Sequence, residues 1–287
     1  MSGTGEELSR KIRSAQDLQS IVRSMKALAA SNIAQYENAV AALQEYYRTV
    51  ELAVRACNRA AAPASLSRAT VAAAPVGALI FGSDQGLVGR FNEALAEFAT
   101  QAPSPLSGRT ARIWAVGERL QSLVTSPVRM FAAPSSVDAI GGLVGEILID
   151  IAAAQEAGEI REVYVFHNAP TAAAMYTPVV RRLLPLDARW QTEIAAIHWP
   201  TPRIPEVIQG AAPALEAFIR EYLFILLFQA SAESLASENA SRLAAMQRAE
   251  KNIEEMLGEM KRRFHRLRQE SIDEELFEVI SGYDSLA

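Results

Sequence analysis

The chain has 287 residues, of which 50% are hydrophobic and 21% charged, a composition that excludes wholesale disorder and suffices for a substantial core. Its formal net charge of −5 argues against a nucleic-acid binder with a dominant basic face. The single cysteine, Cys57, excludes an intramolecular disulfide framework, and the three histidines lie too far apart in sequence to suggest a metal site. No apolar stretch approaches the roughly 18 residues of a membrane-spanning helix, and the N-terminus lacks the layout of a signal peptide. The sequence therefore predicts a cytoplasmic protein that meets a membrane only through partners.

Residues 1–62 are expected to form one long helix. From Glu6 to Arg59 there is neither glycine nor proline, which favours an unbroken helix roughly 80 Å long. From Ala29 to Cys57 apolar residues recur in alternating steps of four and three, the repeat of a coiled coil. A helix of this length with an apolar stripe needs a partner, and Cys57 is expected to pack in the stripe as a small hydrophobe.

Residues 69–205 read as an α/β domain. Short apolar runs alternate with amphipathic stretches, which implies crossover connections and a largely parallel sheet. The prolines at 200, 202 and 205 should end regular structure and act as a linker. Expected strands cover 76–81, 112–117, 128–131, 162–167 and 190–199, and expected helices cover 90–99 and 137–157.

Residues 206–287 are again helical. From Leu243 to Leu267 the four-and-three alternation returns, and only Glu250 breaks its apolar series. A chain that returns from a compact domain would most simply run antiparallel to its start, so the two terminal helices are expected to pair as an antiparallel coiled coil. The fold class is α/β with long helices. Because the C-terminal helix is the longer one, part of it should extend beyond its partner, and such a rod suits the transmission of force or position.

Chemistry-bearing motifs are scarce. No phosphate-binding loop or dinucleotide fingerprint occurs, and no histidine is placed by sequence beside a nucleophile or carboxylate. The turn containing Ser83, Asp84, Gly86 and Gly89 follows a strand and precedes a helix. It is interpreted either as a turn with positive φ angles whose Ser83 or Asp84 caps the next helix, or as an interaction surface. No catalytic residue, metal or cofactor is predicted.

The last helix carries a basic stretch followed directly by an acidic one. The basic residues are Lys261, Arg262, Arg263, Arg266 and Arg268, and the acidic residues are Glu270, Asp273, Glu274, Glu275 and Glu278. Pairing within the helix and a surface that steers charged partners both fit this pattern.

Four stretches resemble motifs of the gamma subunits of rotary F-type ATP synthases. They read IVRSMKALAAS at 21–31, SDQGLVGRFN at 83–92, ENASRLAAMQRA at 238–249 and RQESIDEEL at 268–276. They occur in the family's order, and the resemblance extends from about residue 8 to 282. It implies an antiparallel coiled coil of terminal helices around a Rossmann-like α/β domain.

The resemblance also implies a function. Gamma subunits form a central stalk inside a hexamer of alpha and beta subunits, and their α/β domain docks on the epsilon subunit and the membrane ring of c subunits. Rotation of the stalk drives the catalytic sites of the beta subunits, while gamma itself is not catalytic. The implied location is the cytoplasmic face of the bacterial inner membrane. The resemblance implies no direct insertion into the membrane and no nucleic-acid partner.

The motif match places the partner contacts. Met25 and Lys26 fall where the family's stalk faces an acidic loop of the beta subunit. Arg242 and Gln269 fall where beta-subunit loops grip the stalk, and Glu275 is a weaker candidate for the same contact.

Several positions depart from the family pattern. Gln85 replaces a usual basic residue, Val88 a cysteine, Arg90 a glycine and Asp273 a threonine. These departures suggest a divergent bacterial branch, such as the gamma subunit of an alternative F-type ATPase.

Two other functions remain open from the sequence. One is a coiled-coil interaction scaffold with an α/β head. The other is an enzyme that uses Ser83, Asp84 and His167 at the strand ends.

Overall fold

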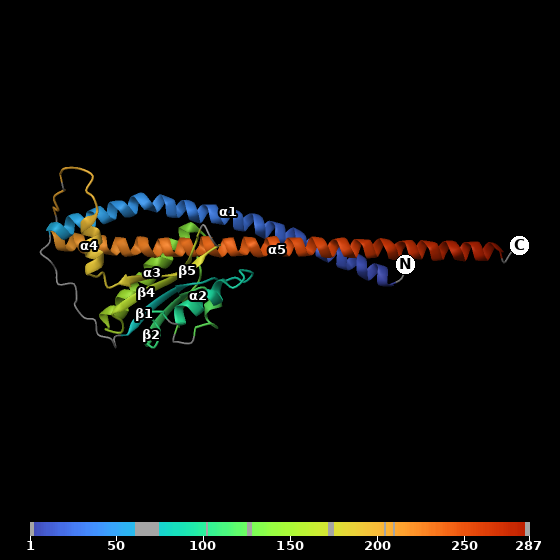
Figure 1. The fold of residues 1–287 in the computed structure, drawn as a ribbon, viewed down its shortest axis with the longest axis horizontal. Helices are drawn as coiled ribbons and strands as arrows, with labels where there is room; N and C mark the ends of the chain where they lie inside the picture. The colour runs from blue at the N-terminus through green and yellow to red at the C-terminus, as the bar shows by residue number, and fades with distance from the viewer. Residues whose placement is uncertain are drawn as a thin grey trace. The chain divides into compact units, whose positions relative to one another are not determined.

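The computed structural model describes residues 3–60, 75–101, 103–124, 128–171, 175–203, 205–208 and 210–284. In chain order the elements are α1 (Gly3–Ala60), β1 (Val76–Phe81), α2 (Phe91–Thr100), β2 (Ala111–Val116), the 3-10 helix η1 (Glu118–Leu120), β3 (Val128–Phe131), α3 (Val137–Glu156), β4 (Glu162–Ala169), β5 (Thr177–Leu184), α4 (Ala188–Ala196) and α5 (Ala211–Asp284) (Figure 1). Over this part of the chain, no helix is both long and apolar enough to cross a membrane.

The five strands form one sheet in the order β3-β2-β1-β4-β5. The pairings from β3 through β4 are parallel, and β5 adds an antiparallel edge to β4. Because β1 is followed in sequence by β2 on one side and lies against β4 on the other, the strand order reverses between β1 and β4. This arrangement is doubly wound and confirms the expected α/β class.

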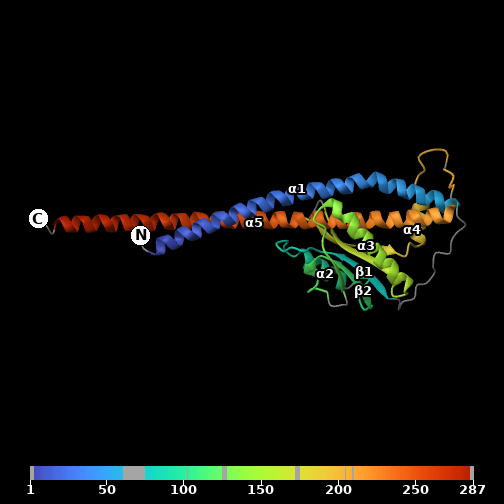
Figure 2. The same cartoon turned by 180° about the vertical axis from the view of Figure 1, so that it is seen from behind.

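Each face of the sheet is covered by helices. Leu79 and Phe81 belong to a core that includes buried residues of α1, α3, α4 and α5. Val76, Ala78 and Ile80 belong to a second core with α2 and η1. This alternation along β1 follows from the two-residue period of a strand, and it places α3 and α5 against one face and α2 against the other (Figure 1 and Figure 2).

The expected strand at 190–199 is wrong, because the structure has helix α4 from Ala188 to Ala196. Asp187 caps this helix, accepting a hydrogen bond at 3.0 Å from the backbone N–H of Trp190. Trp190 and Ile194, the buried residues of α4, are four positions apart, which is the spacing of one helix face.

Strand β5 (Thr177–Leu184) was not expected from the sequence. It is an edge strand in which only Leu183 is buried, and it carries Pro178, Arg181 and Arg182. Proline and charged residues are tolerated at such an edge, but they remove the apolar signal by which a strand is recognised.

The chain divides into two compact units, each considered by itself. One is Ser31–Ser241, which contains the sheet. The other is formed by Met1–Ala30 and Arg242–Ala287. In this second unit α1 and α5 run antiparallel, since Gln19 bonds Glu254 while Lys26 bonds Glu250. Their seam is built from Ala15, Val22, Met246, Ile253 and Leu257.

Candidate functional site

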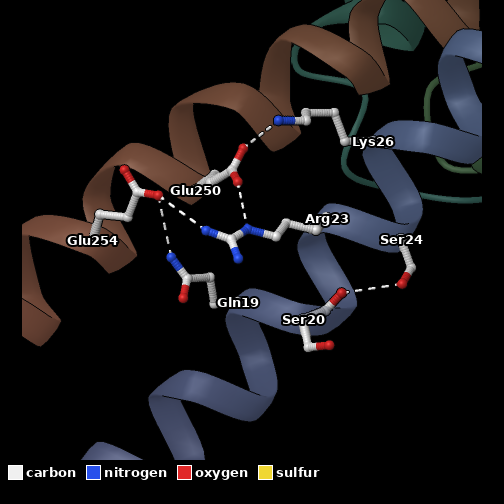
Figure 3. Close-up of polar contacts among 7 residues, drawn as sticks. All are labelled: Gln19, Ser20, Arg23, Ser24, Lys26, Glu250 and Glu254. Atoms are coloured by element: carbon white, nitrogen blue, oxygen red, sulfur yellow. Dashed lines mark hydrogen bonds and ion pairs between the residues drawn. The ribbon is translucent and has the colours of Figure 1, made fainter.

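A cluster of charged side chains crosses between α1 and α5 in the unit formed by the chain ends (Figure 3). The Nε of Arg23 donates to Oε1 of Glu250 at 2.8 Å, and the Nζ of Lys26 donates to Oε2 at 2.5 Å. Glu254 accepts from both Arg23 and Gln19 at 3.3 Å. Glu250, the one residue that interrupts the apolar series of α5, thus holds two cations of α1.

This arrangement sets the electrostatics of the helix pair. The hydrogen bonds from Lys26 and then Arg23 lower the pKa of the Glu250 carboxyl. The Lys26 side chain keeps 36% exposure, and an ammonium has three donors, so it can hold Glu250 and a partner's carboxylate together. The family resemblance predicts a partner contact at Lys26, whereas the bond of Lys26 to Glu250 was not predicted.

The remaining candidate contacts do not gather into one site. Met25 is half-buried and packs against the seam, and Arg242 is also half-buried. Gln269 and Glu275 are exposed. At about 1.5 Å per residue, Arg242 and Gln269 lie roughly 40 Å apart along α5. They can serve only an extended contact.

The turn after β1 is held by internal hydrogen bonds. Ser83 is fully buried; its N–H donates to Oδ1 of Asn92, and its Oγ accepts from Nδ2 of the same residue, both at 2.9 Å. Asp84 accepts from the backbone N–H of Glu118 and of Ala133, each at 2.9 Å. Asp84 therefore joins the segments that follow β2 and β3 to the turn.

The expectation that Ser83 or Asp84 caps the next helix is wrong. The residue at the N-cap of α2 is Arg90, which makes no side-chain cap bond. The Ser83 hydroxyl instead accepts from the Asn92 side chain, and the Asp84 carboxylate accepts from the backbone N–H groups of Glu118 and Ala133. Positive φ occurs at Gly89 (59°) and, without a glycine, at Leu87 (64°), whereas Gly86 is not among the positive-φ residues.

His167 lies at the end of β4 with no exposed side-chain surface. Its Nε2 lies 2.8 Å from Oε2 of Glu233 on α5, and Arg181 approaches the same oxygen at 3.6 Å. Burial lowers the pKa of His167 despite the carboxylate beside it. Burial would raise the pKa of Glu233, but the hydrogen bond from His167 and the charge of Arg181 bring it below its ordinary value.

Three serines of α5 that sequence reasoning passed over bond to the sheet and its loops. Ser234 donates to the carbonyl of Phe81 at 3.0 Å, and Ser237 donates to that of Asn168 at 3.0 Å. Ser241 donates to the carbonyl of Val88 at 2.5 Å. Their signal in the sequence is only small polar residues spaced by three and four in a helix.

The side chains at the strand ends that were candidates for catalysis instead make hydrogen bonds within the chain. Ser83, Asp84 and His167 each bond to another part of the same chain. Among the residues that the structure describes, no three His, Cys, Asp or Glu side chains are grouped so as to hold a metal ion. Cys57 is buried, and burial raises the pKa of its thiol.

Comparisons with known proteins cover nearly the whole chain. A family profile described as ATP synthase matches residues 4–286. The ATP synthase gamma chain of Frankia casuarinae is 30% identical over 100% of this chain and 99% of its own length. That of Thiobacillus denitrificans is 28% identical over 97% of this chain and 98% of its own length.

Solved structures share the fold. A chain of the Euglena gracilis mitochondrial ATP synthase rotor has a TM-score of 0.66 at 14% identity, covering 95% of this chain and 100% of its own. A chain of the Euglena OSCP/F1/c-ring assembly has a TM-score of 0.67 at 15% identity, covering 100% of this chain and 95% of its own.

Proposed function

Since the chain belongs to the gamma-chain family of ATP synthases, it is a central-stalk subunit, and we propose that it acts as the rotor that couples ion flow through a membrane ring to ATP synthesis or hydrolysis. One observation carries the proposal. The family match covers residues 4–286, so it includes both the unit of antiparallel helices formed by the chain ends and the unit that contains the α/β sheet.

The proposed partners are a hexamer of alpha and beta subunits, an epsilon subunit and a ring of c subunits. The Euglena structures with the same fold are described as a rotor and as an OSCP/F1/c-ring assembly, which supports this choice. The proposed location is the cytoplasmic face of a bacterial inner membrane. In this proposal the ATP sites belong to the beta subunits and the chain is not itself catalytic.

The proposed contact residues are those that the motifs pick out. Met25 and Lys26 would face an acidic loop of the beta subunit, and Arg242, Gln269 and Glu275 would meet its other loops. The partial exposure of Lys26 and the exposed positions of Gln269 and Glu275 fit such contacts.

Co-expression of the chain with the alpha and beta subunits of its source tests the assembly. We expect a purified complex with one copy of this chain and sustained ATP hydrolysis. Soluble alpha and beta subunits that never retain the chain would contradict the proposal, and they would favour the scaffold function instead.

Lys26→Gln tests the contact within that assembly. Because Lys26 bonds Glu250, exchange to glutamate would set two carboxylates together and confuse repulsion with loss of contact. We expect Lys26→Gln to lower ion pumping per ATP hydrolysed more than it lowers assembly. Lys251→Gln is the matched control, since Lys251 is exposed and its ion pair, at 4.0 Å, is with Glu255 of its own helix. Equal effects of the two variants on pumping would contradict the proposed contact, and a loss of assembly alone in Lys26→Gln would assign Lys26 a structural role.

A further inference from the structure

The carboxyl ends of the central strands are covered by α5. Phe81 is the last residue of β1, and Asn168 lies next to the end of β4. These are the two strands between which the strand order reverses. In doubly wound sheets the crevice outside these strand ends is where ligands bind. Here the backbone carbonyls at that edge accept hydroxyl groups from α5 instead.

The bonds come from a serine row, defined as Ser234, Ser237 and Ser241. All three residues are at most 3% exposed. Their carbonyl partners belong to β1, to β4 and to the turn after β1, so three separate segments are tied to one helix. Ser234 and Ser241 are seven residue steps apart, or about 10 Å along the helix axis.

The hydrogen bonds of the serine row restrict motions of α5 against the sheet that apolar contacts restrict less. Apolar packing resists separation of the helix from the sheet, but it is non-directional. A hydroxyl bonded to a fixed carbonyl also resists sliding along the helix and rotation about it, since both motions break its geometry. In a buried setting the broken bond cannot be replaced by water, so each serine opposes small displacements.

We propose that the serine row is the fastening that makes α5 and the α/β sheet turn as one body under load, so that these serines are positioning residues for rotary coupling. The inference rests on the proposed rotor function. In this proposal the carboxyl ends of β1 and β4 serve to attach the stalk helix, whereas in other doubly wound folds the same edge holds a ligand.

The same helix supplies a matched control. Ser231 is also buried, at 1% exposure, and its hydroxyl has no hydrogen-bond partner among the residues that the structure describes. It lies three residues before Ser234. Ser231→Ala therefore removes a buried hydroxyl from α5 without removing a bond to the sheet.

The test uses the holoenzyme in inverted membrane vesicles. ATP hydrolysis and ATP-driven membrane potential are measured with a potential-sensitive dye, at equal amounts of incorporated chain, for the triple variant Ser234→Ala, Ser237→Ala and Ser241→Ala and for Ser231→Ala. We expect the triple variant to lose at least about half of its ion pumping per ATP, while Ser231→Ala keeps the wild-type ratio.

A second readout separates slipping from a general loss of structure. In a coupled enzyme the membrane potential slows hydrolysis, and an ionophore relieves this. A fastening that slips under load would let hydrolysis continue, so the ionophore should stimulate the triple variant less than the control. If the triple variant does not assemble, the three single variants are compared with Ser231→Ala in the same way.

The outcomes are distinct. Equal pumping ratios and equal ionophore stimulation in the serine-row variants and in Ser231→Ala overturn the inference. If the wild-type chain is absent from the complex, or if vesicles that lack the chain pump equally well, the proposed function itself fails, before any serine variant is compared.

Discussion

His167 illustrates how one buried side chain can make stability depend on pH. Its ring is fully buried and bonded at Nε2 to Glu233, while its Nδ1 has no hydrogen-bond partner in the structure. A proton added at Nδ1 would therefore be buried without an acceptor. This explains why burial outweighs the neighbouring carboxylate and lowers the pKa of the imidazole.

The sign of the pH effect follows from this lowered pKa. Below about pH 6.5 the unfolded chain binds a proton at His167 that the folded chain does not bind, so the free energy of unfolding falls as the pH falls. The lowered pKa of Glu233 adds a further loss only at lower pH, near the ordinary range of a carboxyl.

We expect wild type to lose about 1 kcal/mol more stability than His167→Gln between pH 7.5 and 5.5, measured by urea unfolding at both values. Glutamine can still donate to Glu233 but does not titrate. The other two histidines are common to both proteins and cancel. Parallel pH profiles would show that His167 is protonated equally in both states.

Asp84 offers a second test at the same scale. One carboxylate accepts two backbone N–H groups, from Glu118 and Ala133, and asparagine has only one oxygen to offer. We expect Asp84→Asn to lower the free energy of unfolding by about 2–3 kcal/mol, because hydrogen bonds to charged groups are the stronger kind. Gln85→Ala, at the exposed neighbouring position, should leave it unchanged. An unchanged stability for Asp84→Asn, with loss of binding to some small molecule, would instead favour a ligand site at this turn.

At the scale of elements, the long helices and the parallel strands could be read from the sequence because their signals are local. The absence of breakers from Glu6 to Arg59 and the apolar run at Val76–Phe81 each needed only neighbouring residues. Helix α4 was mistaken for a strand, because its two buried residues leave a weak pattern.

The hydrogen bonds that join the strand ends to α5 have no local signal in the sequence, because they connect residues far apart in the chain. Ser237 and Asn168 are 69 positions apart, and His167 and Glu233 are 66 apart. No pattern of neighbouring residues predicts that two such distant residues will bond. The residues could be predicted as helical or as strand ends, but their partners depend on how the sheet packs on α5.

The continuity of α5 can be tested directly. Ala249 lies inside the helix, half-buried beside the seam residues. A proline there removes a hydrogen bond and clashes with the preceding turn, at a local cost of about 3 kcal/mol or more. We expect Ala249→Pro to uncouple ATP hydrolysis from ion pumping in membrane vesicles.

Proline in the first turn of the same helix is the control for Ala249→Pro. Ala212 precedes Pro213 near the start of α5, where backbone N–H groups have no partner within the helix. Ala212→Pro should therefore leave coupling at the wild-type level. Undiminished coupling in Ala249→Pro would count against a helix that carries torque.

At the scale of the whole molecule, the C-terminal end of α5 exposes apolar side chains beside the proposed contacts Gln269 and Glu275. None of the described residues from Lys261 to Ser281 is buried. Exposed apolar side chains gather near this end instead of scattering singly, a pattern typical of surfaces that meet another protein. The exposed apolar residues are Ile272, Leu276, Phe277, Val279 and Ile280.

If this end enters a partner assembly, polar replacements should spare the fold and weaken the complex. Leu276 and Phe277 are 58% and 68% exposed, so Leu276→Gln and Phe277→Gln remove little buried contact within the chain. We expect both variants to keep the wild-type unfolding midpoint but to be retained less well by alpha and beta subunits in a pull-down. Glu274→Gln, in the same turn, controls for a simple change of polarity. Retention equal to wild type in all three variants would mean that this apolar surface stays in water within the complex, and the partner contacts would then lie only along the helix pair.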